Sequence, residues 1–152
     1  MDKPAWQFEY SVECGASRQF AWDYWTNVAN WADPPAEFQL DGPFKPGAHL
    51  TTKVPGQHPW ESIIQDVVPG CEATIEMQLV GAALRFHWRF ETVTAERTKI
   101  TQRLTLNGAK AQEFIKPVSI LEQTVPDGMK RLGATMALAE AQQRRTPHCE
   151  SS

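Results

Sequence analysis

The side chains that could carry out acid–base, nucleophilic or metal chemistry are scattered along this chain of 152 residues. The 4 histidines occur singly, and Cys14, Cys71 and Cys149 are widely separated, so neither a zinc site nor a disulfide framework is expected. No nucleophile elbow, phosphate-binding loop or dinucleotide-binding fingerprint is present. We therefore predict no metal and no cofactor, and we assign no catalytic residue.

Three residues are candidates for an acid–base or orienting role, although none has a partner at a telling spacing. Asp66 lies in an apolar stretch, residues 60–68, whose alternation is ambiguous. If Asp66 points inward, it could orient a ligand or act as a base, and if it points outward it is a solvated acid. His49, at the start of a predicted strand, and Arg103 are the other two candidates.

Gln102 is a polar residue at an inward position of an otherwise apolar strand face. A buried amide needs a hydrogen-bond partner, because leaving it unpaired costs about 1–3 kcal/mol. Gln102 therefore bonds either a neighbouring side chain or water, or a carbonyl or hydroxyl group of a ligand. His87 alternates with Phe86 and Trp88, and we expect it on the outer surface.

The elements that would position these side chains are mostly strands, recognised by alternating apolar and polar residues. Several strands place aromatic side chains on the inward face: Trp6, Phe8, Tyr10, Phe86, Trp88 and Phe90. After the N-terminal strand, further strands are expected over residues 37–41, 49–54, 60–68, 73–79, 84–90 and 100–106. The short connections predict an antiparallel sheet with one apolar and one polar face.

Two helical segments are expected, one after the first strand and one at the C-terminus. Ser17 can cap the first helix, and Pro34 and Pro35 would end it. Its apolar face is expected to consist of Phe20, Tyr24, Val28 and Trp31. From about Ala111 a second stripe keeps its phase across Pro126, which predicts one long kinked helix with Val118, Leu121, Val125, Met129, Leu132 and Met136 inward.

The composition is that of one globular domain with an unusually high aromatic content. Hydrophobic residues make up 41% and charged residues 22%, and the 6 Trp and 7 Phe require a core, a pocket or an interface. We expect one domain, residues 1–143, and a disordered tail, residues 144–152. The net charge of −3 argues against nucleic acid as a partner. Without a signal-peptide pattern or a membrane-length apolar stretch, a cytoplasmic location without membrane insertion is expected.

The order strand, helix, six strands and terminal helix is that of the helix-grip fold. Residues 16–31, a small-residue turn followed by an aromatic-rich helix and a Trp, resemble the first-helix signature of the SRPBCC (START-like) superfamily, in particular its polyketide cyclase/dehydrase-like members. Residues 42–53 resemble the loop and strand that follow in those proteins, and residues 84–108 resemble their closing strands. The resemblance covers residues 6–143, but Asn27 stands where these proteins often carry Asp.

The resemblance implies an α+β helix-grip fold, in which a curved antiparallel sheet of six or seven strands wraps around a long C-terminal helix. A short helical segment would follow the first strand. It also implies an internal cavity between sheet and helix, in which a carrier or sensor would bind a small hydrophobic or aromatic molecule. The predicted ligand-binding residues are Trp60, Ile64, Asp66, Ile75, Met77, Phe86, Trp88, Phe90, Gln102, Leu104, Leu121, Val125 and Met129.

Two other functions remain open from the resemblance. One is an enzyme similar to polyketide cyclases or dehydratases that acts on an aromatic or polyketide substrate, with Asp66, His49 and Arg103 as candidates for its chemistry. The other is a protein interaction module like the chaperone activators of the superfamily, with a filled core and a working surface. The oligomeric state, monomer or homodimer, also remains open.

Overall fold

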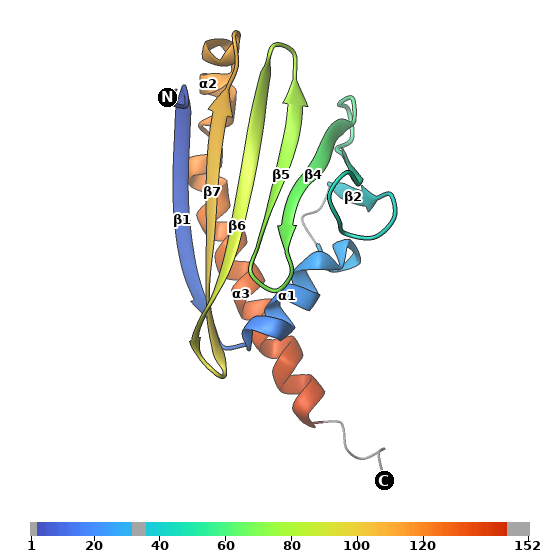
Figure 1. The fold of residues 1–152 in the computed structure, drawn as a ribbon, viewed down its shortest axis with the longest axis vertical. Coiled ribbons are helices and arrows are strands. Elements are labelled where there is room, and N and C mark those ends of the chain that lie inside the picture. The colour runs from blue at the N-terminus through green and yellow to red at the C-terminus, as the bar shows by residue number, and fades with distance from the viewer. Residues whose placement is uncertain (1–2, 32–35, 146–152) are drawn as a thin grey trace.

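The computed structural model describes residues 3–31 and 36–145 and has the predicted α+β helix-grip architecture (Figure 1). The strands are β1 (Trp6–Cys14), β2 (Glu37–Leu40), β3 (His49–Lys53), β4 (Trp60–Val68), β5 (Glu72–Leu79), β6 (Ala82–Thr94) and β7 (Arg97–Asn107). The helical elements are α1 (Arg18–Thr26), η1 (Val28–Asn30), η2 (Ala111–Phe114), α2 (Ile115–Val118) and α3 (Leu121–Arg145).

The strands form one seven-stranded antiparallel sheet, as predicted, and their order in the sheet is β1-β7-β6-β5-β4-β3-β2. The N-terminal strand β1 therefore lies beside β7, which is the last strand of the chain, and α3 follows on one side of the sheet (Figure 1). Residues that lie opposite each other in an antiparallel pair point to the same face of the sheet. The register thus assigns each side chain either to the inner face, toward α1 and α3, or to the outer face.

The ambiguous alternation of β4 is explained by an irregularity in its pairing with β5. Ile64 lies opposite Ile75, but the register shifts by one residue before the next pair, so that Asp66 lies opposite Thr74. Such a bulge reverses the face to which the following residues point. Asp66 is therefore exposed on the outer face, and its prediction as a ligand-binding residue is wrong.

The helix α1 begins as predicted but ends earlier and presents a different face. Ser17 caps it by accepting a hydrogen bond from the backbone N–H of Phe20 at 3.2 Å. The helix ends at Thr26, whereas the proposed stop at residues 33–35 lies outside the described residues. The buried side chains are Ala21, Trp22 and Trp25. Phe20 and Tyr24 of the predicted face are half-buried, pack against the hydrophobic core and stack on each other.

The C-terminal segment is broken before α3, whereas one continuous kinked helix was predicted. Ser119 ends α2, where its hydroxyl donates to the carbonyl of Lys116 at 2.8 Å, and α3 starts anew at Leu121. Pro126 lies inside α3, and the chain remains helical on both sides of it. The prediction of one continuous helix from Ala111 is therefore wrong, because η2 and α2 are separate elements that end before α3 begins. The helix α3 reaches Arg145, beyond the predicted domain limit.

The buried apolar residues form two clusters at opposite ends of the inner face. The α1 core consists of Cys14, Ala16, Ala21, Trp22, Trp25, Val28, Ala48, Leu50, Ile64, Ala73, Ile75, Phe90, Ile100, Met129 and Met136. The α2 core consists of Trp6, Ala82, Leu84, Leu104, Leu106, Ala111 and Val118. The α1 core thus fills one end of the inner face and the α2 core fills the other end. A binding site on the inner face would therefore have to lie between the two cores.

Candidate functional site

Between the two cores lies a zone of the inner face in which large apolar side chains are only half-buried. Phe86 packs against both cores, and so does Val125 of α3, yet neither is fully buried. We call this zone the middle strip and define it by the half-buried side chains of Phe8, Tyr10, Met77, Phe86, Trp88, Leu121 and Val125. Half-exposed rings on a central strand indicate that solvent-accessible space remains between the sheet and the helices.

The position of α3 explains why the middle strip is not covered. The helix makes its closest backbone approaches to β1 and to α1. At Gly133 of α3, an added Cβ would lie 3.2 Å from the Cβ of Cys14 on β1. Because α3 lies closest to the edge strand β1, it does not pack closely against the inner faces of β5 and β6.

Two polar side chains are buried on the inner face without a polar partner. Gln102 is 6% exposed and Ser62 is 2% exposed. Neither side chain makes a hydrogen bond to another residue within the part of the chain that the structure describes. The register places Gln102 between Tyr10 on β1 and Trp88 on β6, inside the middle strip. The predicted burial of Gln102 is confirmed, and no side-chain hydrogen bond to another described residue satisfies its amide.

The inner face carries almost no charge. In the described strands, the inner positions hold no Asp, Glu, His, Lys or Arg, so the Tyr10 phenol and the Cys14 thiol are its ionisable groups. Burial raises the pKa of the Cys14 thiol, and Glu140 adds to this effect, while a backbone hydrogen bond from Ala16 and the charge of Arg97 oppose it. A ligand in the middle strip would therefore meet a neutral, apolar surface.

The charged side chains of the sheet lie on the outer face. Arg85 donates to Glu76 at 2.7 Å. Burial alone would raise the pKa of Glu76, but hydrogen bonds from Arg85 and Gln78 and the charge of Arg85 outweigh it and lower the pKa below its ordinary value of 4.5. His87 lies 2.7 Å from Glu72, also outside, as predicted.

The predicted acid–base candidates do not reach the inner face. Arg103 lies opposite His87 on the outer face and donates to the side chain of Gln7 at 2.8 Å. His49 is exposed, and its register with Ile63 also places it outside. With Asp66 on the outer face as well, all three candidates are wrong for a reaction inside the molecule.

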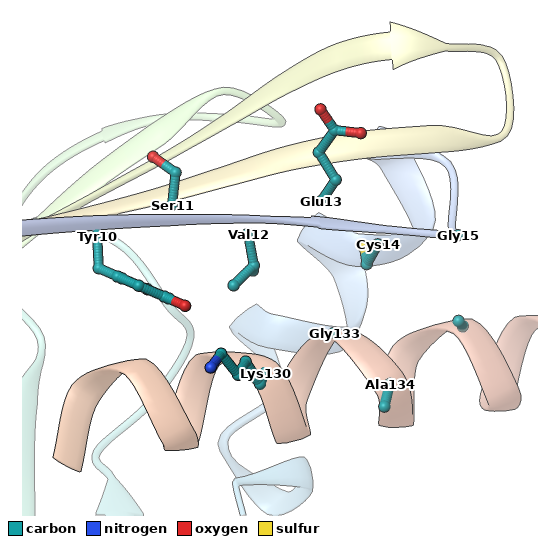
Figure 2. A pocket seen from close by; sticks show the side chains of 10 residues that line it. Tyr10, Ser11, Val12, Glu13, Cys14, Gly15, Lys130, Gly133 and Ala134 are labelled. Carbon is teal, nitrogen blue, oxygen red and sulfur yellow. The ribbon is translucent and has the colours of Figure 1, made fainter. Parts of the chain in front are cut away.

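A groove of about 480 Å³ lies at the edge of the space between sheet and helix (Figure 2). Its strand wall is formed by Tyr10, Ser11, Val12, Glu13, Cys14 and Gly15. Its helix wall is formed by Lys130, Gly133, Ala134 and Ala137. In Figure 2, Tyr10 points from β1 toward α3. Tyr10 therefore borders both the groove and the middle strip, which places one end of the strip next to solvent.

The other predicted ligand-binding residues divide by burial. Met77, Phe86, Trp88, Leu121 and Val125 belong to the accessible middle strip, whereas the remaining apolar ones are fully buried: Ile64, Ile75, Phe90, Leu104 and Met129. Trp60 is 38% exposed at the start of β4, where its indole donates to Gln57 at 3.1 Å. The structure thus brings five of these side chains to the candidate site, makes five of them core, and leaves Trp60 at its rim.

Two features of the site were missed from the sequence. Alternation placed Tyr10 on the inward face, but nothing singled it out as a neighbour of Gln102, which depends on the pairing of β1 with β7. Trp25 was also missed, although its ring centroid lies 5.0 Å from that of Trp88 and supports it from behind. The spacing of Trp22 and Trp25, three residues apart on one helix, was the available signal.

The described residues form neither a metal centre nor a membrane-spanning helix. No group of three or more His, Cys, Asp or Glu side chains in residues 3–31 and 36–145 is arranged to hold a metal ion. No helix in the same ranges has the length and apolar character needed to cross a bilayer. The middle strip is the candidate site that the geometry supports.

Comparison with known proteins identifies the fold. No family model matches the chain, and no curated protein matches it in sequence. Norcoclaurine synthase from Thalictrum flavum, in complex with dopamine and hydroxybenzaldehyde, is similar with a TM-score of 0.66, 16% identity and coverage of 88% of this chain and 87% of that one. The Zhui aromatase/cyclase from Streptomyces sp. R1128 is similar with a TM-score of 0.62, 18% identity and coverage of 93% and 96%.

A third similar structure is DynU16, a protein of the dynemicin biosynthetic locus, with a TM-score of 0.63 and 19% identity. The match covers 84% of this chain and 45% of DynU16. At such identities the similarity concerns the fold. The protein has the α+β helix-grip fold of these structures, which is the fold that the sequence resemblance predicted.

Proposed function

We propose that the protein binds a small, neutral, hydrophobic or aromatic molecule in the middle strip, between the inner face of the sheet and α3, as a carrier or sensor. The observation that carries this proposal is the half-burial of Phe86 and Trp88 on a central strand between two fully buried cores. Covering these rings with a ligand would release roughly 25 cal/mol per Å² of apolar surface, before the costs of association.

The proposed ligand-binding residues are the side chains of the inner face that remain partly exposed, together with Gln102. Met77, Phe86, Trp88, Leu121 and Val125 would contact the ligand, joined by Phe8 and Tyr10, and Gln102 would be its polar contact. The fully buried residues behind them, such as Phe90 and Leu104, would hold the walls in place. The absence of charged groups at the inner positions of the described strands favours a neutral ligand, since a charge moved there would lose its hydration without compensation.

The structural neighbours are compatible with such a ligand. Norcoclaurine synthase forms a complex with dopamine and hydroxybenzaldehyde, which are small aromatic molecules. An identity of 16% does not transfer the ligands of that enzyme to this chain. The complex does indicate that a sheet and helix in this arrangement can hold an aromatic molecule.

An enzyme similar to polyketide cyclases is the second candidate, because the Zhui aromatase/cyclase has the same fold. Holding a folded substrate close to its reactive geometry can itself accelerate a reaction. On the inner face of the described strands, Tyr10 is the ionisable group that borders the middle strip, so proton transfer would have to involve its phenol. We place this candidate second because the face lacks an acid–base pair.

The interaction-module alternative is not favoured. It requires a filled interior and a large exposed apolar patch. The exposed large apolar side chains of the described residues are instead spread over several strands, turns and helices, with two of them at opposite ends of β4: Trp60, Val68, Val80, Val93, Ile120 and Leu138.

The proposal is tested by titrating the purified protein with phenylnaphthylamine, a neutral probe whose fluorescence rises in apolar surroundings. Met77→Arg should weaken binding by about tenfold or more, because it introduces a charge into the middle strip. Gln78→Arg is the matched control, since Gln78 is the next residue of β5 and is exposed on the outer face. Gln78→Arg should bind the probe like the wild-type protein.

Two results would overturn the proposal. One is the absence of binding by the wild-type protein, both for the probe and for a panel of neutral aromatic and aliphatic molecules followed by calorimetry. The other is equal binding by the wild-type protein and both variants, which would move the binding site away from the middle strip. Native mass spectrometry of freshly purified protein adds an independent check for a bound molecule that copurifies.

A further inference from the structure

Three side chains with different chemistry lie in one row across the middle strip. The register of β1, β7 and β6 pairs Tyr10 with Gln102, and Gln102 with Trp88. Side chains directly opposite each other on neighbouring strands have their Cβ atoms about 4.5–5.5 Å apart. A phenol, an amide and an indole therefore stand side by side on the inner face, and we call them the Tyr10–Gln102–Trp88 row.

The amide in the centre of the row is the unusual member. Gln102 is 6% exposed, but its side chain has no hydrogen-bond partner among residues 3–31 and 36–145. Thr98, on the same strand and face, is also buried, but its hydroxyl donates to the carbonyl of Ala16 at 2.7 Å. The fold therefore satisfies one buried polar side chain of β7 internally, whereas the other has no partner among the described residues and lies beside the half-buried side chains of the middle strip.

The indole at one end of the row is held in place from behind. The rings of Trp25 and Trp88 lie with centroids 5.0 Å apart and planes inclined by 37°. Phe90, the next inner residue of β6, lies 6.5 Å from Trp88 in a stacked arrangement. Trp88 nevertheless stays half-buried. An indole that is fixed on one side and accessible on the other provides a platform on which an aromatic ring can stack.

The phenol at the other end connects the row to solvent. Tyr10 is half-buried, lines the groove between β1 and α3, and points toward the helix (Figure 2). Its hydroxyl makes no hydrogen bond to a side chain or backbone group in the described part of the chain. It is thus a second polar group, next to Gln102, that can donate to or accept from the same ligand atom.

From this row we infer that the ligand is a neutral aromatic molecule with an oxygen attached to its ring system, as in a phenol or an aryl ketone. The ring stacks on Trp88, and the oxygen is bound by the amide of Gln102 with the Tyr10 hydroxyl nearby. The spacing of adjacent strands suits a substituent attached directly to the stacked ring. This inference rests on the proposed function and narrows the class of ligand.

The same row disfavours two other classes of ligand. A carboxylate would find no cation on the inner face of the described strands. A pure hydrocarbon would leave the buried amide of Gln102 unpaired, which is a cost that an oxygen-bearing ligand removes. The expected selectivity is therefore for one oxygen on an otherwise apolar aromatic molecule.

The test compares naphthol with ethylnaphthalene, which is similar in shape but lacks the oxygen, by calorimetric titration. The wild-type protein should bind naphthol about tenfold more tightly. Gln102→Leu should abolish this preference and leave the affinity for ethylnaphthalene unchanged or higher. Gln39→Leu, at an exposed outer position of β2, is the matched control and should keep the wild-type preference.

The outcomes separate this inference from the proposed function. If the wild-type protein binds both compounds equally, or if Gln102→Leu keeps the preference for naphthol, the inferred role of Gln102 is wrong while binding in the middle strip stands. If neither compound binds while phenylnaphthylamine does, the inferred class of ligand is wrong, and if none of the three compounds nor the panel of neutral molecules binds, the proposed function itself fails. Acetonaphthone, which can only accept a hydrogen bond, adds a second arm: binding tighter than that of ethylnaphthalene, with the difference lost in Gln102→Leu, supports the inference and shows that the Gln102 amide donates. Binding of acetonaphthone no tighter than that of ethylnaphthalene would contradict the inference for an aryl ketone.

Discussion

Two phenylalanines of the same strand meet very different surroundings. Phe90 is 1% exposed and packs edge-on against Trp22, with ring centroids 5.4 Å apart. Phe86 lies four residues earlier on the same face of β6, about 13 Å away along the strand. It is half-buried and has no ring partner among the described aromatic residues. The two residues have the same type, strand and face, so the difference in their burial comes from the element that packs over each side chain.

The element behind Phe90 is α1, which inserts Trp22 and Trp25 against the inner face. Phe86 has no such helix packed closely against it, because α3 makes its closest backbone approaches to β1 and α1. One end of the sheet is therefore packed for stability, while the middle keeps accessible apolar surface. Phe90 therefore contributes to stability, whereas Phe86 borders the proposed binding site. Mutations at the two residues should separate stability from binding.

The largest expected effect tests this separation directly. Phe90→Ala should lower the free energy of unfolding by about 3–5 kcal/mol, because it leaves a cavity among packed rings. Phe86→Ala should lower it by about 1–2 kcal/mol, since that ring is already partly solvated. Urea denaturation of both variants measures the difference. Equal losses would mean that the middle strip is packed like the α1 core, and the comparison would fail.

The next effect compares two buried polar residues of β7. Thr98→Val should cost about 1–3 kcal/mol, because it removes the donor that satisfies the carbonyl of Ala16. Gln102→Leu should leave the stability unchanged or raise it by about 1 kcal/mol, since it removes an amide without a protein partner. Thermal denaturation of the ligand-free proteins measures both, and Thr105→Val on the outer face serves as the control. A clear loss for Gln102→Leu would contradict the described environment of the amide.

A smaller effect is expected at the α2 end of the sheet. The indole of Trp6 donates to the carboxylate of Glu122 at 2.8 Å and so ties the start of β1 to the first turn of α3. Trp6→Phe keeps most of the apolar surface but loses this bond, and it should cost about 1 kcal/mol. Trp60→Phe is the control, because its bond to Gln57 is exposed and should contribute little. If both variants lose the same stability, the Trp6–Glu122 bond does not anchor the helix.

The smallest effect concerns Glu76 on the outer face of β5, and it is lost in acid. The pKa of Glu76 is lowered in the folded protein, so its carboxylate stabilises the fold above the ordinary pKa of 4.5, and this contribution is lost as the pH falls below that value. The stability difference between the wild-type protein and Glu76→Gln should therefore shrink from about pH 6 to about pH 3. Urea midpoints across this range measure it. A difference that is independent of pH would show that Glu76 acts through packing alone.

The strands could be predicted from the sequence because most of them alternate without interruption. In β6 and β7, the inner residues Leu84 to Phe90 and Ile100 to Leu106 follow strict alternation, and the hairpin between the two strands fixes their register. In β4 the rule failed for Asp66, because the extra residue Gln65 reverses the alternation and no glycine or proline marks it. Alternation alone carries no information on a bulge of this kind.

The helical face and the accessible strip could not be read from local sequence. Apolar residues surround most of α1, so the pair Phe20 and Tyr24 and the pair Trp22 and Trp25 are equally consistent with a buried side. Contact with β6 decides between them. Likewise, Phe86 and Phe90 differ only through the placement of helices that are distant in the chain. Tertiary packing, which no local pattern encodes, determines which apolar residues form the core and which border a site.

The pairing of β1 with β7 has a consequence for how the chain is made. Ser11 and Thr101, whose hydroxyl groups lie 2.8 Å apart, are separated by 90 positions. During synthesis, β1 leaves the ribosome long before its partner β7 has been made. The apolar side chains of Trp6, Phe8 and Tyr10 therefore stay exposed to solvent during this time. We expect the nascent polypeptide to complete its sheet only after β7 has emerged, and to need protection from aggregation until then.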